Sequence, residues 1–156
     1  MQIGLGFDIH RIRPARKGHI LLAGLKIAAP YRIEAHSDGD FVFHALADAI
    51  GSALGLGDIG EQFPPGLAKT RGMNSRLILD HYLSQLKKTK GRLLCVSLVV
   101  VAEKPKLGFY REEIRRSLAQ ALHLMPAKVG LTFKTFEALE PLAQKSVACW
   151  ANCLIR

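Results

Sequence analysis

The sequence predicts an α+β fold, a mixed β-sheet with helices packed on one face. Residues 93–102 are almost all apolar, which is typical of a strand that is covered on both sides. Residues 110–122 place apolar side chains at helical spacing on one face. Candidate strands and helices follow one another without strict alternation, and this order favours α+β over a doubly wound sheet.

The first half of the chain supplies two candidate strands and one buried helix. Residues 1–10 alternate like a strand, and residues 19–22 resemble a short second one. Residues 29–36 are expected to be a loop, after which Ser37 and Asp38 follow as candidate N-caps. The helix then begins near Asp40 and ends at the glycines of positions 55–57. Pro64 and Pro65 block regular structure in the turn-rich segment after it.

The second half alternates helices and strands more clearly. Residues 74–88 carry apolar side chains at helical spacing, and the apolar strand 93–102 and the helix 110–122 follow. Residues 129–136 alternate as a strand. Residues 146–155 fit either a strand or a helix. We find no internal repeat or linker, so residues 1–156 are expected to form one domain.

Composition favours a cytoplasmic protein with an anionic partner. No apolar run is long enough to span a bilayer, no signal segment is evident, and Cys95, Cys149 and Cys153 are expected to be buried thiols. The formal net charge of +9 favours an anionic partner. Basic residues are scattered over positions 11–17, 87–90 and 111–116 without a recognisable nucleic-acid-binding module. A phosphorylated small molecule explains the charge as well as nucleic acid does.

A polar stripe on the first helix suggests a metal site. Asp40, His44 and Asp48 recur every four residues and so share one helix face. Asp8 and His10 are two apart on a strand and point to the same side. With His44 they would offer two imidazoles and one carboxylate, which suits a catalytic Zn²⁺ with an open fourth position. Asp48 could fix the imidazole tautomer. Alternatively, His44 is a core histidine and the strand pair lies at the surface.

Three further pairs of polar residues lie at predicted loops: His36 with Ser37, Lys104 with Lys106, and Thr135 with Glu137. The first pair fits helix capping as well as function. The second leaves the most buried strand, where side chains and free backbone groups can meet phosphate or remain solvated. The third pair could bind phosphate and a second cation. Spacing alone does not decide among these alternatives.

Three motifs in order, GFDIH, AHSDGDFVFHALADAIGSALGLGDIGEQFP and AEKPKL, resemble the 2-C-methyl-D-erythritol 2,4-cyclodiphosphate synthase family. The resemblance covers residues 1–137 and returns at 146–149. It implies a ferredoxin-like α+β sheet and a homotrimer with active sites between subunits. The implied partner is a nucleotide diphosphate substrate, with neither nucleic acid nor membrane.

The activity that this resemblance implies is a metal-dependent phosphorus–oxygen lyase of isoprenoid precursor biosynthesis, the methylerythritol phosphate route. The 2-phosphate of 4-diphosphocytidyl-2-C-methyl-D-erythritol 2-phosphate would attack the β-phosphorus, close a cyclic diphosphate and release CMP. The protein would chiefly position the reacting groups and neutralise charge. The alternative is a metal- and cytidine-nucleotide-binding homologue with weak or lost activity.

The resemblance also assigns roles to single positions. Asp8, His10 and His44 would bind Zn²⁺, which would hold a β-phosphate oxygen, and His36 and Thr135 would stabilise the transition state. Residues 102–107 would form the wall around the cytosine. A Mg²⁺ or Mn²⁺ ion bridging the phosphates would be bound by a further carboxylate, Glu137. The implied substrate contacts are Asp8, His10, His36, Ser37, Asp58, Ile59, Gly60, Phe63, Ala102, Lys104, Pro105, Lys106, Leu107, Lys134, Thr135, Phe136 and Glu137.

The chain departs from the family pattern at four places. Pro65 and Asn74 each stand where an Asp is usual, and Lys134 stands where a phosphate-binding Thr is usual. A lysine could still meet that phosphate as a point charge. Residues 140–146, EPLAQKS, replace a glycine-rich run that contains an arginine. Pro65 and residues 140–146 are the basis of the alternative with weak or lost activity.

Overall fold

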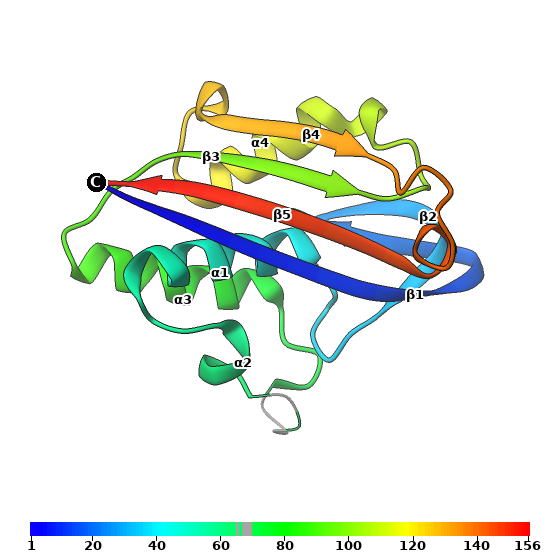
Figure 1. The fold of residues 1–156 in the computed structure, drawn as a ribbon, viewed down its shortest axis with the longest axis horizontal. Helices are drawn as coiled ribbons and strands as arrows, with labels where there is room; N and C mark the ends of the chain where they lie inside the picture. Colours follow the sequence, from blue (N-terminus) through cyan, green and yellow to red (C-terminus); the bar gives the residue numbers. More distant parts are fainter. Residues whose placement is uncertain (65, 67–69) are drawn as a thin grey trace.

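Figure 1 shows a computed structural model of the chain, which describes residues 1–64, 66 and 70–156. Within them, one mixed sheet has the strand order β2-β1-β5-β3-β4, and the α+β prediction is confirmed. The elements are β1 (Gln2–Leu22), β2 (Leu25–Glu34), α1 (Phe41–Leu54), α2 (Ile59–Gln62), α3 (Ser75–Lys88), β3 (Leu93–Val101), η2 (Leu107–Tyr110), α4 (Arg111–Leu122), η3 (Pro126–Lys128), β4 (Val129–Lys134), α5 (Leu142–Lys145) and β5 (Ser146–Ile155).

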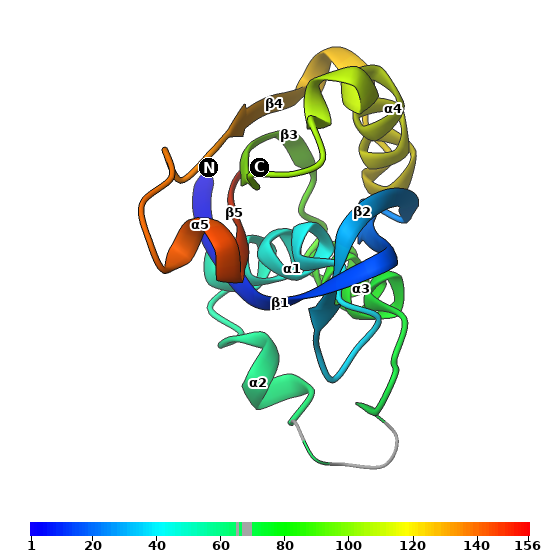
Figure 2. The ribbon, with the colours of Figure 1, turned by 90° about the vertical axis from the view of Figure 1, so that its right-hand side faces the viewer.

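The three long helices cover the same face of the sheet. The β3–β4 pair is parallel, whereas β1–β2, β1–β5 and β3–β5 are antiparallel. Helix α1 packs on β1 and β5, α3 lies against α1, and α4 lies against β4 (Figure 2). Leu46 and Ile50 of α1, Tyr82 of α3 and Leu98 of β3 are fully buried between the layers. The expected helix-covered face is therefore present.

Two glycines let α1 approach β1 unusually closely. A Cβ atom at Gly4 would lie 1.8 Å from the Ala49 carbonyl oxygen, and one at Gly6 would lie 2.0 Å from that of Ala45. Any side chain at either strand position would therefore clash with helix backbone. The contact places the part of β1 that carries Asp8 directly beside the turn of α1 that carries His44.

Two strand predictions need correction. Residues 2–22 form one continuous strand instead of two, with a register shift between Pro14 and Gly18 where the chain bulges against β2. The loop expected at 29–36 is wrong over most of its length, because residues 25–34 form β2 with alternating burial. Pro30 lies within this strand, but β2 is an edge strand and Pro30 is exposed to solvent, where a missing N–H is tolerated.

The N-caps expected for the first helix also need correction. Asp40 caps α1, so the expectation that Ser37 or Asp38 would do so is wrong. Asn74 caps α3 by accepting a hydrogen bond from the Arg76 backbone, a role that Asn fills as well as the usual Asp. Residues 146–155 are a strand. Pro65 lies outside the described residues, and no described helix is long and apolar enough to cross a membrane.

The Asp40 carboxylate joins α1 to the turn between β1 and β2. It accepts backbone N–H bonds from Ala23 (3.0 Å), Gly24 (2.6 Å) and Phe43 (3.2 Å), and the residue is 1% exposed. Burial raises the pKa of Asp40 despite these three donors, which favour the ionised form. Asp40 thus serves as a structural clamp, whereas His44, on the same stripe, faces the metal-ligand candidates.

We expect Asp40→Ala to lower the free energy of unfolding by roughly 3 kcal/mol or more, because three buried N–H groups would lose their acceptor. Urea unfolding measures this change. Asp80→Ala is the matched control, since Asp80 pairs with Arg76 at the surface of α3 and its loss should cost less than about 1 kcal/mol. Equal losses of unfolding free energy in the two variants would contradict this structural role of Asp40.

Candidate active site

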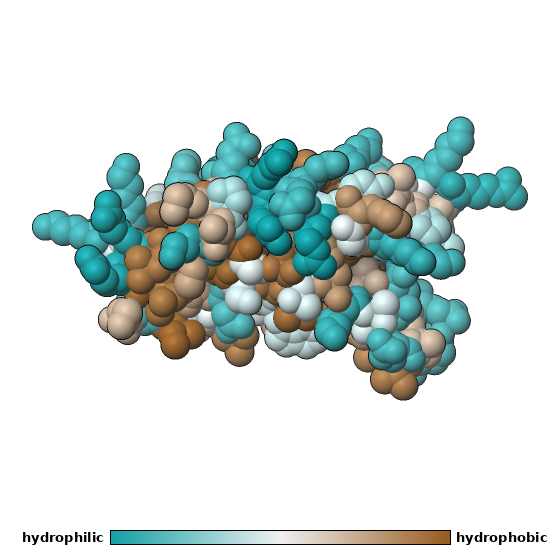
Figure 3. Space-filling view, turned by 90° about the horizontal axis from the view of Figure 1, so that it is seen from above, coloured by the Kyte–Doolittle hydropathy of each residue, from teal (hydrophilic) through white to brown (hydrophobic). Residues whose placement is uncertain are grey.

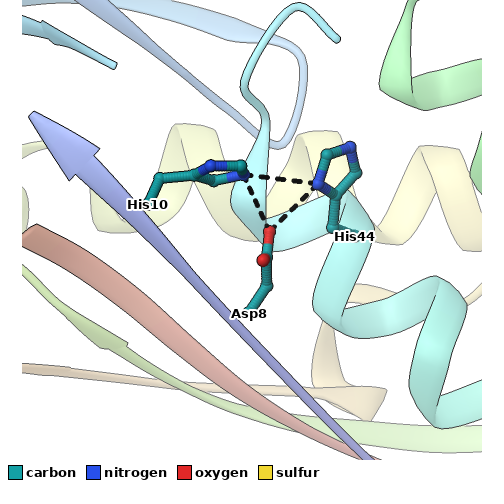
Figure 4. Close-up of side chains that lie close together, drawn as sticks. All are labelled: Asp8, His10 and His44. Carbon is teal, nitrogen blue, oxygen red and sulfur yellow. Dashed lines mark hydrogen bonds and ion pairs between the residues drawn. The ribbon is translucent and has the colours of Figure 1, made fainter. Parts of the chain in front are cut away.

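Asp8, His10 and His44 meet at one point, as Figure 4 shows. The Asp8 Oδ2 atom lies 3.0 Å from His10 Nε2 and 3.0 Å from His44 Nδ1, and the two nitrogens are 3.4 Å apart. Asp8 and His10 come from the same side of β1, and His44 comes from the first turn of α1. The structure therefore brings together all three residues that the sequence had grouped.

This geometry fits a tetrahedral metal ion. Ligands about 2.1 Å from such an ion are about 3.4 Å from one another, close to the separations found here. Burial disfavours the charged Asp8 carboxylate, but its close contacts with the His10 and His44 rings outweigh burial and hold its pKa well below the usual range. The carboxylate is therefore ionised and ready to bind a cation. The group could hold a divalent metal ion with a position left for another ligand.

The opposite edge of the His44 ring contacts two hydroxyl groups. Its Nε2 atom lies 2.9 Å from Ser75 Oγ and 3.2 Å from Ser37 Oγ. Asp48, which the spacing had suggested as the orienting partner, instead accepts a hydrogen bond from the Ile59 backbone at 2.9 Å and so holds the start of α2. Ser75 was missed because it lies 31 residues away, and no local pattern marks it.

A hollow of about 220 Å³ opens beside the metal-ligand candidates. Several of the residues expected to bind substrate line it. His44 and further apolar or hydroxyl side chains, which the sequence did not mark as substrate contacts, complete the lining. Its lining residues are His10, His36, Ser37, His44, Ile59, Gly60, Phe63, Thr70, Met73 and Ile78. An apolar floor beside polar and metal-binding groups suits a small polyol phosphate.

A second hollow, of about 360 Å³, lies where β3 and β4 end. Lys106 and Lys134 supply positive charge there, and Glu137 supplies a carboxylate. Its lining residues are Ala102, Glu103, Pro105, Lys106, Leu107, Gly108, Phe133, Lys134, Thr135 and Glu137. The two hollows share no lining residue among those described, so within one chain the expected site is divided into two parts.

Glu103 holds the loop after β4 in place. Its Oε1 atom accepts the Phe136 backbone N–H at 2.7 Å, and the Thr135 hydroxyl donates to Glu137 Oε1 at 2.9 Å. Glu137 and Ala138 both adopt left-handed backbone angles, with φ of 53° and 57°. Such angles are unfavourable for side chains of this kind and persist only where surrounding contacts enforce them. Glu103 was missed because this contact joins the ends of two strands.

Apart from the metal-ligand candidate Asp8, three expected substrate contacts line neither hollow. The Asp58 carboxylate caps α2 by accepting the Glu61 N–H at 2.9 Å. Lys104 lines a neighbouring hollow, and its carbonyl oxygen accepts a short hydrogen bond from the Tyr31 hydroxyl. Phe136 is fixed through its backbone but does not line the second hollow. The substrate roles of these residues stay predictions, as do those of the residues that line the hollows.

Comparison with known proteins agrees with the site. The YgbB family matches residues 1–156. A 2-C-methyl-D-erythritol 2,4-cyclodiphosphate synthase of Thermus thermophilus is 45% identical over 141 residues, covering 90% of this chain and 91% of that protein. The Treponema denticola protein of the same name is 36% identical, covering 99% and 96%.

Solved structures agree in fold as well. A structure of 2C-methyl-D-erythritol-2,4-cyclodiphosphate synthase in a CDP-bound form is 40% identical, with a TM-score of 0.90 over 99% of this chain and 100% of that one. A CDP complex of the Plasmodium falciparum protein is 30% identical, with a TM-score of 0.85, covering 99% and 94%. The chain therefore belongs to the YgbB family, the family of the 2-C-methyl-D-erythritol 2,4-cyclodiphosphate synthases.

Proposed function

We propose that this protein converts 4-diphosphocytidyl-2-C-methyl-D-erythritol 2-phosphate to 2-C-methyl-D-erythritol 2,4-cyclodiphosphate and CMP, a step in isoprenoid precursor biosynthesis. The observation that carries the proposal is the Asp8–His10–His44 group beside a partly apolar hollow. Relatives up to 45% identical carry the name of this synthase, and a structural neighbour is described with CDP bound. The substrate ends in the same cytidine diphosphate group.

Two cations fit the donors that the chain offers. Two imidazoles and a carboxylate at tetrahedral spacing suit Zn²⁺. Glu137, an exposed carboxylate beside Thr135, is an oxygen donor of the kind that Mg²⁺ or Mn²⁺ prefers, and we assign it to an ion that bridges the substrate phosphates. When bound, these ions polarise the phosphoryl oxygens and neutralise the charge that develops on them.

The side chains would position an intramolecular displacement. Ser37 and the apolar hollow would hold the methylerythritol phosphate end, and residues 102–107 would hold the cytosine through backbone groups. An oxygen of the 2-phosphate forms the new bond to the β-phosphorus as the bond to the CMP oxygen breaks. His36 and Thr135 would donate hydrogen bonds to the phosphoryl oxygens at this point, and Lys134 would meet phosphate in place of the usual threonine.

The expected site residues are divided between two hollows of one chain, and we propose that a neighbouring copy of the chain completes the site. Ile3, Leu5, Phe7 and Ile9 on β1 are between 43% and 77% exposed, and Trp150 on β5 packs against Phe7. In Figure 3 hydrophobic surface gathers toward the end where Figure 1 places the start of β1. These five residues form an apolar strip on the uncovered sheet face. Such a strip suits a homotrimer with its active sites between subunits.

A metal- and cytidine-nucleotide-binding homologue with weak or lost activity is the second candidate. Residues 140–146 favour it, because they form the short helix α5 and its flanks where the family has a glycine-rich, arginine-containing run. The metal-ligand candidates are all in place, which supports the active enzyme. We further propose that residues 1–156 act as one domain in the cytoplasm.

Turnover tests the two candidates. We expect CMP release from the cytidyl substrate with Zn²⁺ and Mg²⁺, and a loss of about 100-fold or more in His44→Ala, because one of the three metal ligands is removed. His123→Asn is the matched control, since His123 ends α4 in a left-handed conformation that Asn also adopts. A folded, zinc-loaded wild type that binds CDP without releasing CMP would support the second candidate instead.

The apolar strip predicts the oligomeric state. We expect a trimer by light scattering and a shift toward monomers in Leu5→Glu, because burying a carboxylate in an apolar interface is costly. Leu77→Glu is the control, since Leu77 is similarly exposed, at 59% against 58%, but lies on α3. If both variants keep the mass of the wild type, the strip is not the interface.

Mixed oligomers test the shared site. His44→Ala removes the metal-binding part, and Glu137→Ala alters the other hollow. Each variant alone should be inactive, whereas trimers that contain both chains would hold a site with two intact parts. We expect CMP release to return in trimers purified through two different tags. Inactive mixed trimers would show that both parts must lie in the same chain.

A further inference from the structure

The metal-ligand candidate His44 lies at one end of a chain of hydrogen bonds that runs away from the metal site. Its Nε2 atom is 2.9 Å from Ser75 Oγ. The Ser75 hydroxyl makes a short bond to Asp38 Oδ1. Ser75 is 0% exposed and His44 9%, so solvent hardly competes for these bonds. Ser75 belongs to the first turn of α3, and Asp38 belongs to the loop before α1.

The Asp38 carboxylate can only accept hydrogen bonds here, and its partners are donors. Its Oδ2 atom accepts the Ser75 backbone N–H at 3.1 Å, and its Oδ1 atom accepts the Asp40 N–H at 3.2 Å. The Ser75 hydroxyl hydrogen must therefore point to Asp38. A hydroxyl has one hydrogen, so Ser75 Oγ can act toward His44 only as an acceptor.

The direction of these bonds fixes the role of one His44 nitrogen. Because Ser75 Oγ accepts from the imidazole, Nε2 must carry a hydrogen, and Nδ1 is the ring nitrogen left to face Asp8 at 3.0 Å. A metal ion beside Asp8 would bind through the lone pair of that atom. Ser37 Oγ, at 3.2 Å from Nε2, already accepts the Gly39 backbone N–H and is the longer of the two contacts.

We propose that Ser75 and Asp38 are positioning residues that hold the His44 ring for metal binding, with the hydrogen on Nε2 donated to Ser75 and Nδ1 turned toward Asp8. This proposal rests on the metal site proposed above. Two backbone bonds connect that site to the loop that carries His36. The Asp38 N–H donates to the Met73 carbonyl oxygen at 3.0 Å, and the Gly72 N–H donates to the His36 carbonyl oxygen at 2.6 Å. These contacts position a metal ligand and one side of the substrate hollow together.

The first measurement needs no metal. Nitrogen NMR of the wild type, with histidine labelled in the ring, should show a hydrogen on His44 Nε2 at neutral pH, identified by the signals lost in His44→Ala. In Ser75→Ala this hydrogen should be missing in part of the molecules, since its acceptor is gone. A wild-type His44 whose Nε2 carries no hydrogen overturns the proposal, and this result does not require the Ser75 variant to fold.

The second measurement is Zn²⁺ affinity, by competition with a chromophoric chelator. We expect Ser75→Ala to bind Zn²⁺ between about 10-fold and 100-fold more weakly than the wild type, and Ser75→Thr, which keeps the hydroxyl, to restore most of the affinity. Ser84→Ala, the same change at an exposed position of α3, is the control. Wild-type affinity in a folded Ser75→Ala would overturn the proposal. Failure of the metal site itself is distinguishable, because the wild type would then not bind Zn²⁺.

Discussion

The buried carboxylate of Asp40 is the constraint on which the rest of the site depends. It binds the N-terminus of α1 to the turn between β1 and β2, and the helix then runs across β1 where Gly4 and Gly6 leave room for its backbone. Since His44 follows Asp40 by about one helical turn, its ring reaches the side of β1 that carries Asp8. Fold stability and metal-ligand geometry therefore share the same few contacts.

The division of the site into two hollows connects the fold to assembly. The metal-ligand candidates belong to β1 and α1, whereas the phosphate- and cytosine-binding candidates follow β3 and β4. The uncovered sheet face carries the apolar strip of Ile3, Leu5, Phe7, Ile9 and Trp150. Association through this strip would bury it and could bring one chain's metal site to another chain's nucleotide hollow. The same association would then both form the oligomer and complete its active sites.

The sequence predicted which residues form the metal site better than it predicted the residues and strands that hold them in place. The spacings within β1 and α1 grouped Asp8, His10 and His44 because both elements repeat regularly. Family motifs suggested the residues of the second hollow. The edge strand β2 was missed, since its pairing with β1 depends on a partner strand that local pattern does not show. The contacts of Ser75 and Glu103 join positions more than 30 residues apart, and they could not be read from any window of sequence.

A crystal structure of the protein with Zn²⁺ and CDP, recorded with anomalous scattering at the zinc edge, would test whether the metal site and the nucleotide hollow meet between chains. We expect an anomalous peak within bonding distance of Asp8 Oδ2, His10 Nε2 and His44 Nδ1. We also expect a CDP phosphate on that ion, with the cytosine against residues 102–107 of a neighbouring copy. A zinc ion bound elsewhere, or a nucleotide held entirely by the chain that binds the zinc, would contradict this expectation.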